Sequence, residues 1–288
     1  PDAMASLPAL GITGPGPAAL AAGTSSAMIL CYSQFLPVEG TTSITLDNTL
    51  TGLYGYASGQ AAFGDLLGWF VSRCAPEEVL RAAQDAHISA HEELSRRAAR
   101  LRPGESGLIC LDWWNGNRSC LADMRLSGML LGMTLQTRPE EIYRAMIEAT
   151  AFGTRMIVDN FRAHGVAVED FFATGGISRK NGMAMQIYAD VLHMPVRVAD
   201  TDQGPALGSA IFAAAAAGSA RGGYDTVAQA VAHMASARYT VYHPDAGSAE
   251  IYDRLYAEYA RLHDYFGRGE NDVMKRLKRI REGALKQH

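Results

Sequence analysis

The sequence lacks the short motifs by which nucleotide- and metal-binding proteins are most easily identified. The GxGxxG pattern of dinucleotide-binding folds, the GxxxxGK[ST] pattern of P-loop proteins and the HExxH pattern of zinc enzymes are all missing. Cysteine is scarce and has no CxxC spacing. This excludes a disulfide-stapled secreted domain and predicts reduced thiols in the core of a cytoplasmic protein, at Cys31, Cys74, Cys110 and Cys120. No apolar run approaches the roughly 20 residues of a membrane span, and no signal peptide is expected.

A clear excess of either charge is missing too. The 26 basic and 30 acidic residues leave a net charge of −4, so composition gives no electrostatic argument for a nucleic acid or an anionic membrane as partner. Hydrophobic residues make up 48% and charged residues 19% of the 288 positions, which is typical of a globular protein with one large domain or two small ones. The opening Pro1-Asp2-Ala3 has no initiator Met, and we expect the sequence to be part of a longer protein.

The most informative stretch runs from Phe171 to Asp200. An apolar run at 168–174 ends at Gly175-Gly176, apolar residues then recur at helical spacing, and a second apolar run covers 194–199. A period of 2 that changes to 3.6 and back predicts strand, glycine turn, helix and strand. Paired glycines let a backbone approach a nucleotide, and Asn181 as the helix N-cap would leave free N–H groups at the helix start. The glycines are equally expected if they only end the strand.

Two earlier stretches carry glycine in similar positions. Residues 18–32 predict a β-hairpin whose turn, Gly23-Thr24-Ser25, either offers backbone N–H groups and hydroxyl donors to a phosphate or is a plain turn. Residues 59–73 predict a helix in which Gly64 and Gly68 lie one turn apart. That glycine stripe allows close packing by a neighbouring helix or by a ligand.

Most of the remaining chain is predicted to be helical. One helix is expected to start at Pro76 and continue to Arg100, with His87 and His91 one turn apart; with no third ligand evident, the pair suits a solvated helix face better than zinc. An alanine-rich helix at 205–218 has to be closely packed and ends at Gly218. The last helix is basic and suits a solvated face better than lipid or a calmodulin-like partner. The other expected helices cover 138–164, 225–236 and two segments from about Ser248 that are separated by Gly267-Arg268-Gly269.

Several segments together resemble the carboxy-terminal half of the FGGY carbohydrate kinases, and among these most of all the bacterial ribulokinases. Residues 128–133, GMLLGM, are followed after seven residues by EIYRAMIE at 141–148, which is similar to the second signature pattern of that family. The stretches LDWWNGNRS, ATGGI with the following KN, and LHDYFG are similar to ribulokinase sequence as well. The resemblance extends over essentially the whole chain.

The resemblance implies an α/β fold of the actin, hexokinase and Hsp70 type (ribonuclease H-like), with a mixed twisted sheet flanked by helices. Residues 1–240 would be the nucleotide-binding domain and residues 241–288 a helical extension packed on it, while the amino-terminal sugar-binding domain would lie outside this sequence. The implied cofactors are ATP and Mg²⁺, and the implied partners are a sugar, the amino-terminal domain and a second copy in a homodimer. Nucleotide contacts are implied at Gly23, Thr24, Gly64, Gly68, Gly175, Gly176 and Asn181.

The implied catalytic residue is Asp2. It stands where the family has the Asp that takes the proton from the sugar hydroxyl, although spacing alone would make it only part of a frayed terminus. Two positions depart from the ribulokinase pattern: Met4 stands in place of a His, and Ala57 in place of a Glu that contacts the sugar. We therefore expect a kinase of a ketopentose such as ribulose. The alternatives are a kinase of another ketose or polyol and a non-catalytic ATP-binding domain on the same scaffold.

Overall fold

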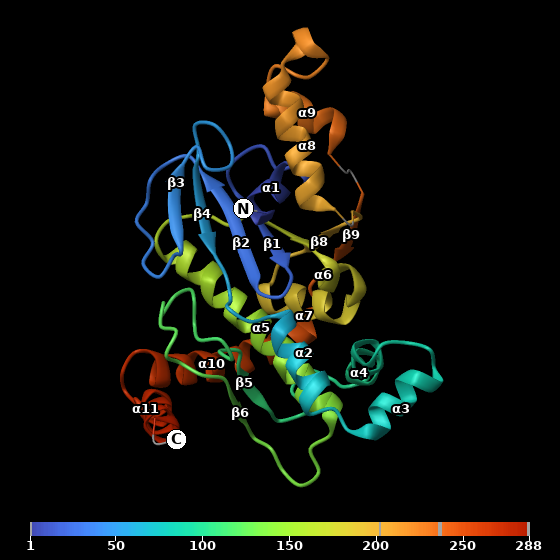
Figure 1. The fold of residues 1–288 in the computed structure, drawn as a ribbon, viewed down its shortest axis with the longest axis vertical. Helices are drawn as coiled ribbons and strands as arrows, with labels where there is room; N and C mark the ends of the chain where they lie inside the picture. Colours follow the sequence, from blue (N-terminus) through green and yellow to red (C-terminus); the bar gives the residue numbers. More distant parts are fainter. Residues whose placement is uncertain (1, 202, 236–237, 287–288) are drawn as a thin grey trace.

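The computed structural model describes residues 2–201, 203–235 and 238–286, and for Asp2 it describes the backbone alone. Within these residues, seven strands form one sheet in the order β3–β4–β2–β1–β7–β8–β9 (Figure 1). Their bounds are β1 Pro17–Ala22, β2 Ser26–Tyr32, β3 Ser43–Leu46, β4 Tyr54–Ser58, β7 Asp170–Thr174, β8 Val196–Ala199 and β9 Tyr239–Tyr242.

The sheet is mixed. Strands β1 and β2 form the predicted hairpin, antiparallel around Gly23-Thr24-Ser25. Strand β7 runs parallel to both β1 and β8, so the expectation of adjacent strands on either side of the paired glycines is confirmed. Because β1 and β7 are parallel neighbours, their carboxyl ends meet at one edge of the sheet, and each of these ends leads into a glycine turn.

Both faces of the central strands are buried, as their alternating side chains require. Leu20, Leu30 and Tyr56 belong to the larger core, which lies under α5 (Pro139–Ala163), α2 (Gly64–Arg73) and α7 (Gly182–Leu192). The neighbouring residues Ala19, Ile29 and Ala57 belong to a smaller core under α1 (Asp2–Ala9). The sheet therefore separates the helix that carries Asp2 from the long helices of the main core (Figure 1).

The helix predicted from Pro76 to Arg100 is two helices, and the prediction of a single one is wrong. Helix α3 (Glu77–Asp85) ends before His87, whose φ of 53° is left-handed, and α4 (Ala90–Ala98) begins after Ser89. The Ser89 hydroxyl accepts a hydrogen bond from the Glu92 N–H at 3.1 Å, which is a helix N-cap. His87 and His91 consequently do not share a helix face, and among the described residues no cluster of three potential metal ligands is found.

The predicted helix at 59–73 also begins later, as α2 starts at Gly64. A short helix that was not expected, α6 (Gly176–Lys180), begins at the second of the paired glycines and precedes α7. The prediction that all four cysteines are core thiols is wrong for Cys74, which is exposed, while Cys31 and Cys110 are buried.

The alanine-rich helix α8 (Gly204–Ala217) ends before Gly218 as expected, but it is closely packed along only one stripe. A methyl group at Gly208 would lie 1.5 Å from the carbonyl oxygen of Ala5, so the backbones of α8 and α1 touch here and only glycine fits. Most of the other side chains of α8 are partly or fully exposed. Helix α9 (Val227–Met234) packs beside α8 in the same projecting part (Figure 1).

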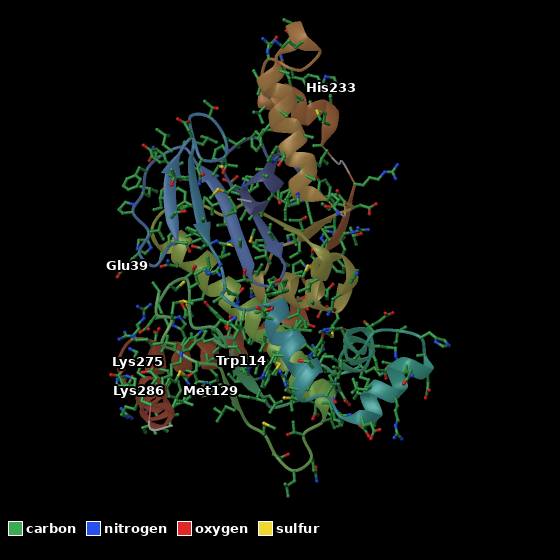
Figure 2. The ribbon with its side chains drawn as sticks, in the orientation of Figure 1. Glu39, Trp114, Met129, His233, Lys275 and Lys286 are labelled. Atoms are coloured by element: carbon green, nitrogen blue, oxygen red, sulfur yellow. The ribbon has the colours of Figure 1, made fainter. Side chains whose placement is uncertain are left out.

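The carboxy-terminal segment adds two helices, α10 (Ala246–Gly267) and α11 (Val273–Leu285). Helix α10 packs against α5 and α7 and against β5 (Ile109–Leu111), which forms a small sheet with β6 (Met129–Leu131). Lys275 and Lys286 mark the basic helix α11 in Figure 2. No helix among the described residues is long and apolar enough to cross a membrane.

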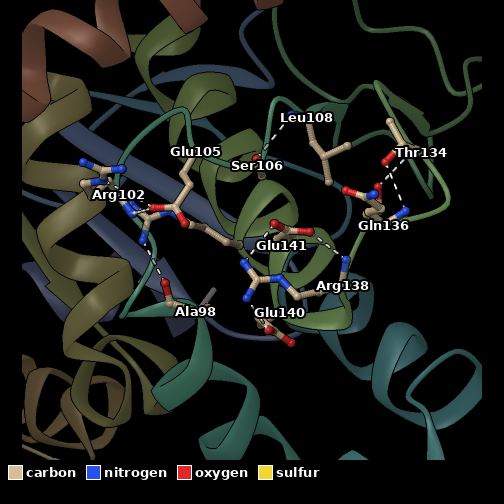
Figure 3. A network of polar contacts seen from close by, with 12 residues as sticks. Ala98, Arg102, Glu105, Ser106, Leu108, Thr134, Gln136, Arg138, Glu140 and Glu141 are labelled. Carbon is tan, nitrogen blue, oxygen red and sulfur yellow. Dashed lines mark hydrogen bonds and ion pairs between the residues drawn. The ribbon is translucent and has the colours of Figure 1, made fainter.

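The start of α5 is fixed by charge. Pro139 occupies the first turn, and Glu141 accepts hydrogen bonds from the backbone N–H of Arg138 at 2.6 Å and from its guanidinium at 3.0 Å (Figure 3). Glu140 lies 3.5 Å from the same guanidinium. Carboxylates in the first turn also interact favourably with the positive end of the helix dipole.

We expect Arg144→Met to lower the free energy of unfolding by about 3–5 kcal/mol. The buried guanidinium of Arg144 donates to Glu148 at 2.8 Å, to Tyr252 at 2.7 Å and to the carbonyls of Ala98 and Leu101 at 3.0 and 2.9 Å. It thus joins α5 to α4 and α10, and its removal leaves the buried carboxylate of Glu148 without its cation. Urea unfolding measures the loss.

Arg81→Met is the matched control for this experiment. Arg81 pairs with Glu77 on the exposed surface of α3, where an ion pair contributes at most about 1 kcal/mol. Equal losses in the two variants would contradict the assignment of Arg144 as a structural centre.

Candidate functional site

One large cavity opens where the carboxyl ends of β1 and β7 meet α2, α4 and α5. Its volume is about 1010 Å³. The walls combine backbone at glycine with polar side chains, and the lining residues are Ala22, Gly23, Thr24, Gly64, Asp65, Leu67, Ser89, His91, Glu92, Ser95, Tyr143, Gly176, Ile177, Lys180 and Asn181. Of the seven residues that the sequence suggested for a nucleotide, the structure brings Gly23, Thr24, Gly64, Gly176 and Asn181 to this cavity.

The turn between β1 and β2 is held against α2 by its carbonyl groups. The carbonyl of Gly23 accepts from the N–H of Gly64 at 3.0 Å, and that of Thr24 accepts from Phe63 at 3.0 Å and Asp65 at 3.1 Å. These bonds satisfy N–H groups at the start of α2, which would otherwise have no partner within the helix. The start of α2 therefore has fewer free donors than its place at the cavity suggests.

Gly64 is required by this contact, whereas Gly68 is not. A methyl group at Gly64 would lie 2.8 Å from the Gly23 oxygen and 3.1 Å from the Ile177 side chain. A methyl group at Gly68 would meet nothing within 4 Å, and Gly68 is not among the residues that line the cavity. The two glycines predicted to act together thus have different surroundings.

The paired glycines also differ from each other. Gly175 has a φ of 105°, and a methyl group on it would lie 2.4 Å from the carbonyl oxygen of Ala22 in β1. Gly176 is exposed, and a methyl group on it would meet nothing within 4 Å. Gly175 therefore lets β1 and β7 end side by side, while the absence of a side chain at Gly176 keeps the cavity open.

We expect Gly175→Ala to destabilise the protein by about 1–3 kcal/mol, because it forces a left-handed backbone and a clash on a non-glycine residue. Gly176→Ala, at the next position, is expected to change stability by no more than about 0.5 kcal/mol. Thermal unfolding of the two variants provides the comparison. A larger loss for Gly176→Ala would contradict this description of the turn.

Asn181 caps α7, as the sequence predicted. Its side-chain oxygen accepts from the N–H of Ala184 at 3.0 Å, and its side-chain nitrogen donates to the Ser95 hydroxyl of α4 at 3.0 Å. The Nδ1 atom of His91 lies 3.0 Å from the Tyr143 hydroxyl of α5. Polar side chains of three helices are thereby connected along one wall of the cavity.

The charges around the cavity are mixed. Lys180 contributes a cation next to Asn181, whereas Asp65 and Glu92 contribute carboxylates. Partial burial lowers the pKa of His91, which favours the neutral imidazole at neutral pH. Among the described residues that line the cavity, Lys180 is thus the cation available to a phosphate.

A second cavity, of about 660 Å³, lies on the other side of α2 and is mainly apolar. It is lined by the indoles of Trp69 and Trp114 and by Met129, the first residue of β6 (Figure 2). It contains none of the glycine turns. The polar cavity at the ends of β1 and β7 is therefore the candidate site for a phosphorylated ligand.

Comparison of the sequence with models of known protein families shows which family the chain belongs to. The model of the C-terminal domain of the FGGY family of carbohydrate kinases matches residues 18–217. The chain belongs to this family. The match includes the glycine turns and Asn181, and it ends at Ala217, the last residue of α8, so Asp2 and the segment from β9 onward lie outside it.

Individual FGGY relatives agree with this assignment. The chain is 50% identical to a ribulokinase of Halalkalibacterium halodurans over 280 residues, which are 97% of this chain and 50% of the relative. It is 48% identical to a ribulokinase of Geobacillus thermodenitrificans over 283 residues, 98% of this chain and 50% of the relative. The chain thus spans about half the length of the curated relatives it matches.

A solved structure of a family member has the same fold. The xylulose kinase from Rhodospirillum rubrum superposes with a TM-score of 0.75 at 31% identity, over 90% of this chain and 49% of that one. Together with the mixed sheet and its flanking helices, this likeness confirms the predicted actin- and hexokinase-like α/β fold.

Of two further residues that the FGGY resemblance singled out, Asp2 and Ala57, only Ala57 has a described side chain, and it is not among the residues that line the cavity. The backbone of Asp2 begins α1, and its side chain lies outside the part that the structure describes. Ala57 lies in β4, opposite Ile29 of β2, and it packs in the small core that also contains Met4. Met4 and Ala57, the two positions that depart from the ribulokinase pattern, therefore share one apolar cluster at α1.

Gln60, which follows Ala57 in the same run, has no free side-chain group for a ligand. Its amide nitrogen donates to Asp112 at 3.0 Å and to the Thr150 carbonyl at 2.8 Å, and its oxygen accepts from Ser26 at 2.9 Å and from Thr154 at 3.1 Å. Burial raises the pKa of Asp112 to about 6. This network fixes the end of β4 to α5.

Helix α1 reaches the edge of the sheet where the paired glycines begin. A methyl group at Gly204, the first residue of α8, would lie 3.0 Å from the Thr174 hydroxyl and 3.9 Å from the Ser6 hydroxyl. Ser6 of α1 and Thr174, which precedes Gly175, are therefore close neighbours across Gly204. The helix that begins with Asp2 and the turn that borders the cavity meet at this point.

Sequence reasoning missed Ser95 and Tyr143 as cavity residues, and it assigned His91 to a solvated helix face in preference to a zinc site. Ser95 and His91 lie far from the glycine turns in sequence, and Tyr143 lies inside a regular amphipathic helix, so no local pattern marks them. Lys180 had a local signal, since it directly precedes Asn181.

Proposed function

We propose that this chain is the nucleotide-binding half of an ATP-dependent sugar kinase. The observation that supports this most strongly is that the turns after β1 and β7 line one polar cavity together with Gly64 and Asn181. In open α/β sheets, ligands bind outside the carboxyl ends of the strands, where these two turns lie.

The phosphates of ATP would lie along the two turns. Gly23 and Thr24 are exposed at the end of β1, Gly176 has open space above it, and Lys180 supplies a positive charge. Gly175 and Gly64 would contribute to phosphate binding indirectly. Gly175 lets the ends of β1 and β7 lie side by side, and Gly64 lets α2 pack against the turn after β1. We also keep Gly68 as a proposed contact of the nucleotide. It lies in α2, one helical turn after Gly64.

Asp2 would be the general base of the transfer. Its carboxylate takes the proton of the sugar hydroxyl while that oxygen attacks the γ-phosphorus, and the bond from the γ-phosphorus to the bridging oxygen breaks to release ADP. The position of α1 supports this role, because Ser6 of the same helix lies near Gly204 and Thr174, and Thr174 stands two residues before Gly176 of the cavity wall. The other residues of this chain bind and orient the nucleotide.

Mg²⁺ would arrive with the nucleotide. Among the described residues no group of three carboxylate, imidazole or thiol side chains could hold a metal ion. Kinase Mg²⁺ is commonly held by substrate phosphates, waters and only one or two carboxylates, so the residues present are compatible with it. When bound, the ion would neutralise charge on the phosphates.

The proposed acceptor is a terminal hydroxyl of a ketopentose such as ribulose. This rests on the ribulokinase relatives, while Met4 and Ala57 make the surface beneath α1 apolar where the family pattern has His and Glu. A different ketose or polyol is the first alternative, and a non-catalytic nucleotide-binding domain is the second. Comparing turnover with ribulose, xylulose and their polyols separates these cases.

The remaining sugar contacts would come from an amino-terminal domain outside this sequence. We propose residues 1–240 as the nucleotide-binding domain and residues 241–288 as a helical extension, since α10 packs across α5 and α7. The resemblance also predicts a homodimer and a cytoplasmic location. Analytical ultracentrifugation of the full protein tests whether it is a dimer.

We expect the 288-residue chain to bind ATP but to show little or no sugar-dependent ADP release, because half of the cleft that excludes water is absent. The full protein should bind ATP and release ADP only with its sugar. Calorimetric titration and a coupled ADP assay on both proteins make this test. Rapid sugar-dependent turnover by the chain alone would contradict the two-domain mechanism, and a full protein that does not bind ATP would contradict the function.

A further inference from the structure

A third cavity, much smaller than the two described above, lies where α10 packs against the segment that follows β5. Its volume is about 10 Å³. One water molecule needs about 10–15 Å³, so nothing larger than a water fits. The cavity borders on the Gln60 network, since Gln60, Asp112 and Tyr259 line it together with Trp113 and His263. Most of its lining residues are buried.

Trp113 contributes a hydrogen-bond donor that lacks an acceptor. Its side chain is 1% exposed, and none of the residues that the structure describes accepts a hydrogen bond from its Nε1–H group. The indole nitrogen can only donate. An unpaired buried N–H group is unfavourable and rare in folded proteins, so an acceptor is expected beside the indole.

His263 of α10 contributes the complementary group. Its Nδ1 atom lies 3.0 Å from a carboxylate oxygen of Asp264. The pKa of Asp264 is below its usual value, because burial, which raises it, is outweighed by hydrogen bonds from His263 and Arg268. Asp264 is therefore ionised near neutral pH and can only accept, so Nδ1 of His263 carries the proton and donates it.

This leaves Nε2 of His263 as an acceptor. Burial lowers the pKa of His263, so the imidazole is neutral near pH 7 and has its single proton on Nδ1. His263 is 1% exposed, and within the described part of the chain Nε2 has no hydrogen-bond partner. The ring centroids of Trp113 and His263 lie 5.6 Å apart with an angle of 71° between the planes, and the two nitrogens do not bond to each other.

One unpaired donor and one unpaired acceptor at the same small cavity restrict what it can hold. The N–H group disfavours a metal cation, and the imidazole lone pair disfavours an anion. A molecule that satisfies both groups has to accept one hydrogen bond and donate another. At this volume, the molecule with both capacities is water.

We propose that this cavity binds one structural water molecule, which accepts a hydrogen bond from Nε1 of Trp113 and donates one to Nε2 of His263. The carboxylate of Asp112 lines the same cavity and offers an acceptor for the second proton of the water. The inference does not depend on the proposed function. The water would join α10 to the segment after β5, beside the network that fixes the end of β4.

Crystal structures of the full protein, at a resolution that shows ordered waters, test the site directly. We expect one peak of electron density within about 2.7–3.2 Å of both Nε1 of Trp113 and Nε2 of His263. Two results would overturn the inference. One is a cavity without density between well-ordered rings, and the other is a direct hydrogen bond between the two nitrogens.

His263→Gln and His263→Phe form a matched pair. The side-chain oxygen of Gln can replace Nε2 as an acceptor, whereas Phe fills similar space and accepts nothing. The density should persist in His263→Gln and disappear or weaken in His263→Phe. In urea unfolding, His263→Phe should have an equilibrium constant for unfolding about 5- to 150-fold larger than His263→Gln, because it leaves the buried indole N–H unpaired. Equal stability, or an unchanged water in His263→Phe, would contradict the bridge.

A measurement in solution keeps the inference testable if His263→Phe does not fold. In the full protein labelled with ¹⁵N-tryptophan, the Trp113 indole proton should be protected from exchange with solvent and still show a nuclear Overhauser effect to water. Trp113→Phe identifies its signal by removing it. A protected indole proton without any effect from water would overturn the inference.

Discussion

Asp2→Asn is expected to lower kcat of the full protein by about 10²–10⁴-fold and to leave ATP affinity nearly unchanged. That range is the usual loss when a positioned general base is removed. The amide of Asn cannot accept the proton of the sugar hydroxyl, whereas the proposed phosphate contacts lie on other residues, at the turns after β1 and β7. A coupled ADP assay together with calorimetric ATP titration measures both quantities.

Asp85→Asn is the matched control. Asp85 is exposed at the end of α3, away from the cavity, and the same change of charge there should alter neither quantity. Full turnover by Asp2→Asn would remove the only side chain of this chain assigned to the chemical step. The non-catalytic alternative would then be the better description.

Gly176→Asp is expected to have the opposite effect and to weaken ATP binding by between about 5- and 1000-fold. A carboxylate about 4 Å from a phosphate costs roughly 1–4 kcal/mol, depending on how far water screens the pair. A side chain at Gly176 meets open space, so the protein itself should fold normally. ATP titration measures the effect, and thermal unfolding checks the fold.

Gly176→Asn separates charge from size in this experiment. It has nearly the same shape as Asp and no charge, so a much smaller loss is expected. If both variants bind ATP like the wild type, the phosphates do not lie at this turn. If both lose binding equally, exclusion by volume rather than repulsion explains the effect.

The elements with a strong local pattern could be predicted from the sequence. The hairpin around Gly23 and the strand, glycine turn, helix and strand from 168 to 199 are found where they were expected, because alternation and glycine are local signals. Asn181 as an N-cap belongs to the same group. These features sufficed to point to the edge of the sheet where the cavity lies.

The break between α3 and α4 shows the limit of such signals. Residues 77–98 contain no glycine or proline, so composition favours one helix. Ser89, three residues before Glu92, was the available sign of a new N-cap, and it carries less weight than the surrounding helix formers. This break decides that His91 belongs to the cavity wall and does not pair with His87.

Other features depend on contacts that are distant in sequence. That Gly64 and Gly68 have different roles follows from the approach of Gly23 and Ile177, which no local pattern encodes. Two hydrogen bonds, from Asn181 to Ser95 and between His91 and Tyr143, bring together three helices in the same way. For Asp2, only the resemblance to the FGGY kinases gave a reason to consider it.

The central claim is that the nucleotide binds between the turns after β1 and β7, and a crystal structure of the full protein with a non-hydrolysable ATP analogue and Mg²⁺ tests it most directly. We expect the triphosphate beside Gly23 and Gly176 and the base against the wall that contains Asn181. Nucleotide in the apolar cavity between Trp69 and Trp114, with the polar cavity empty, would contradict the account.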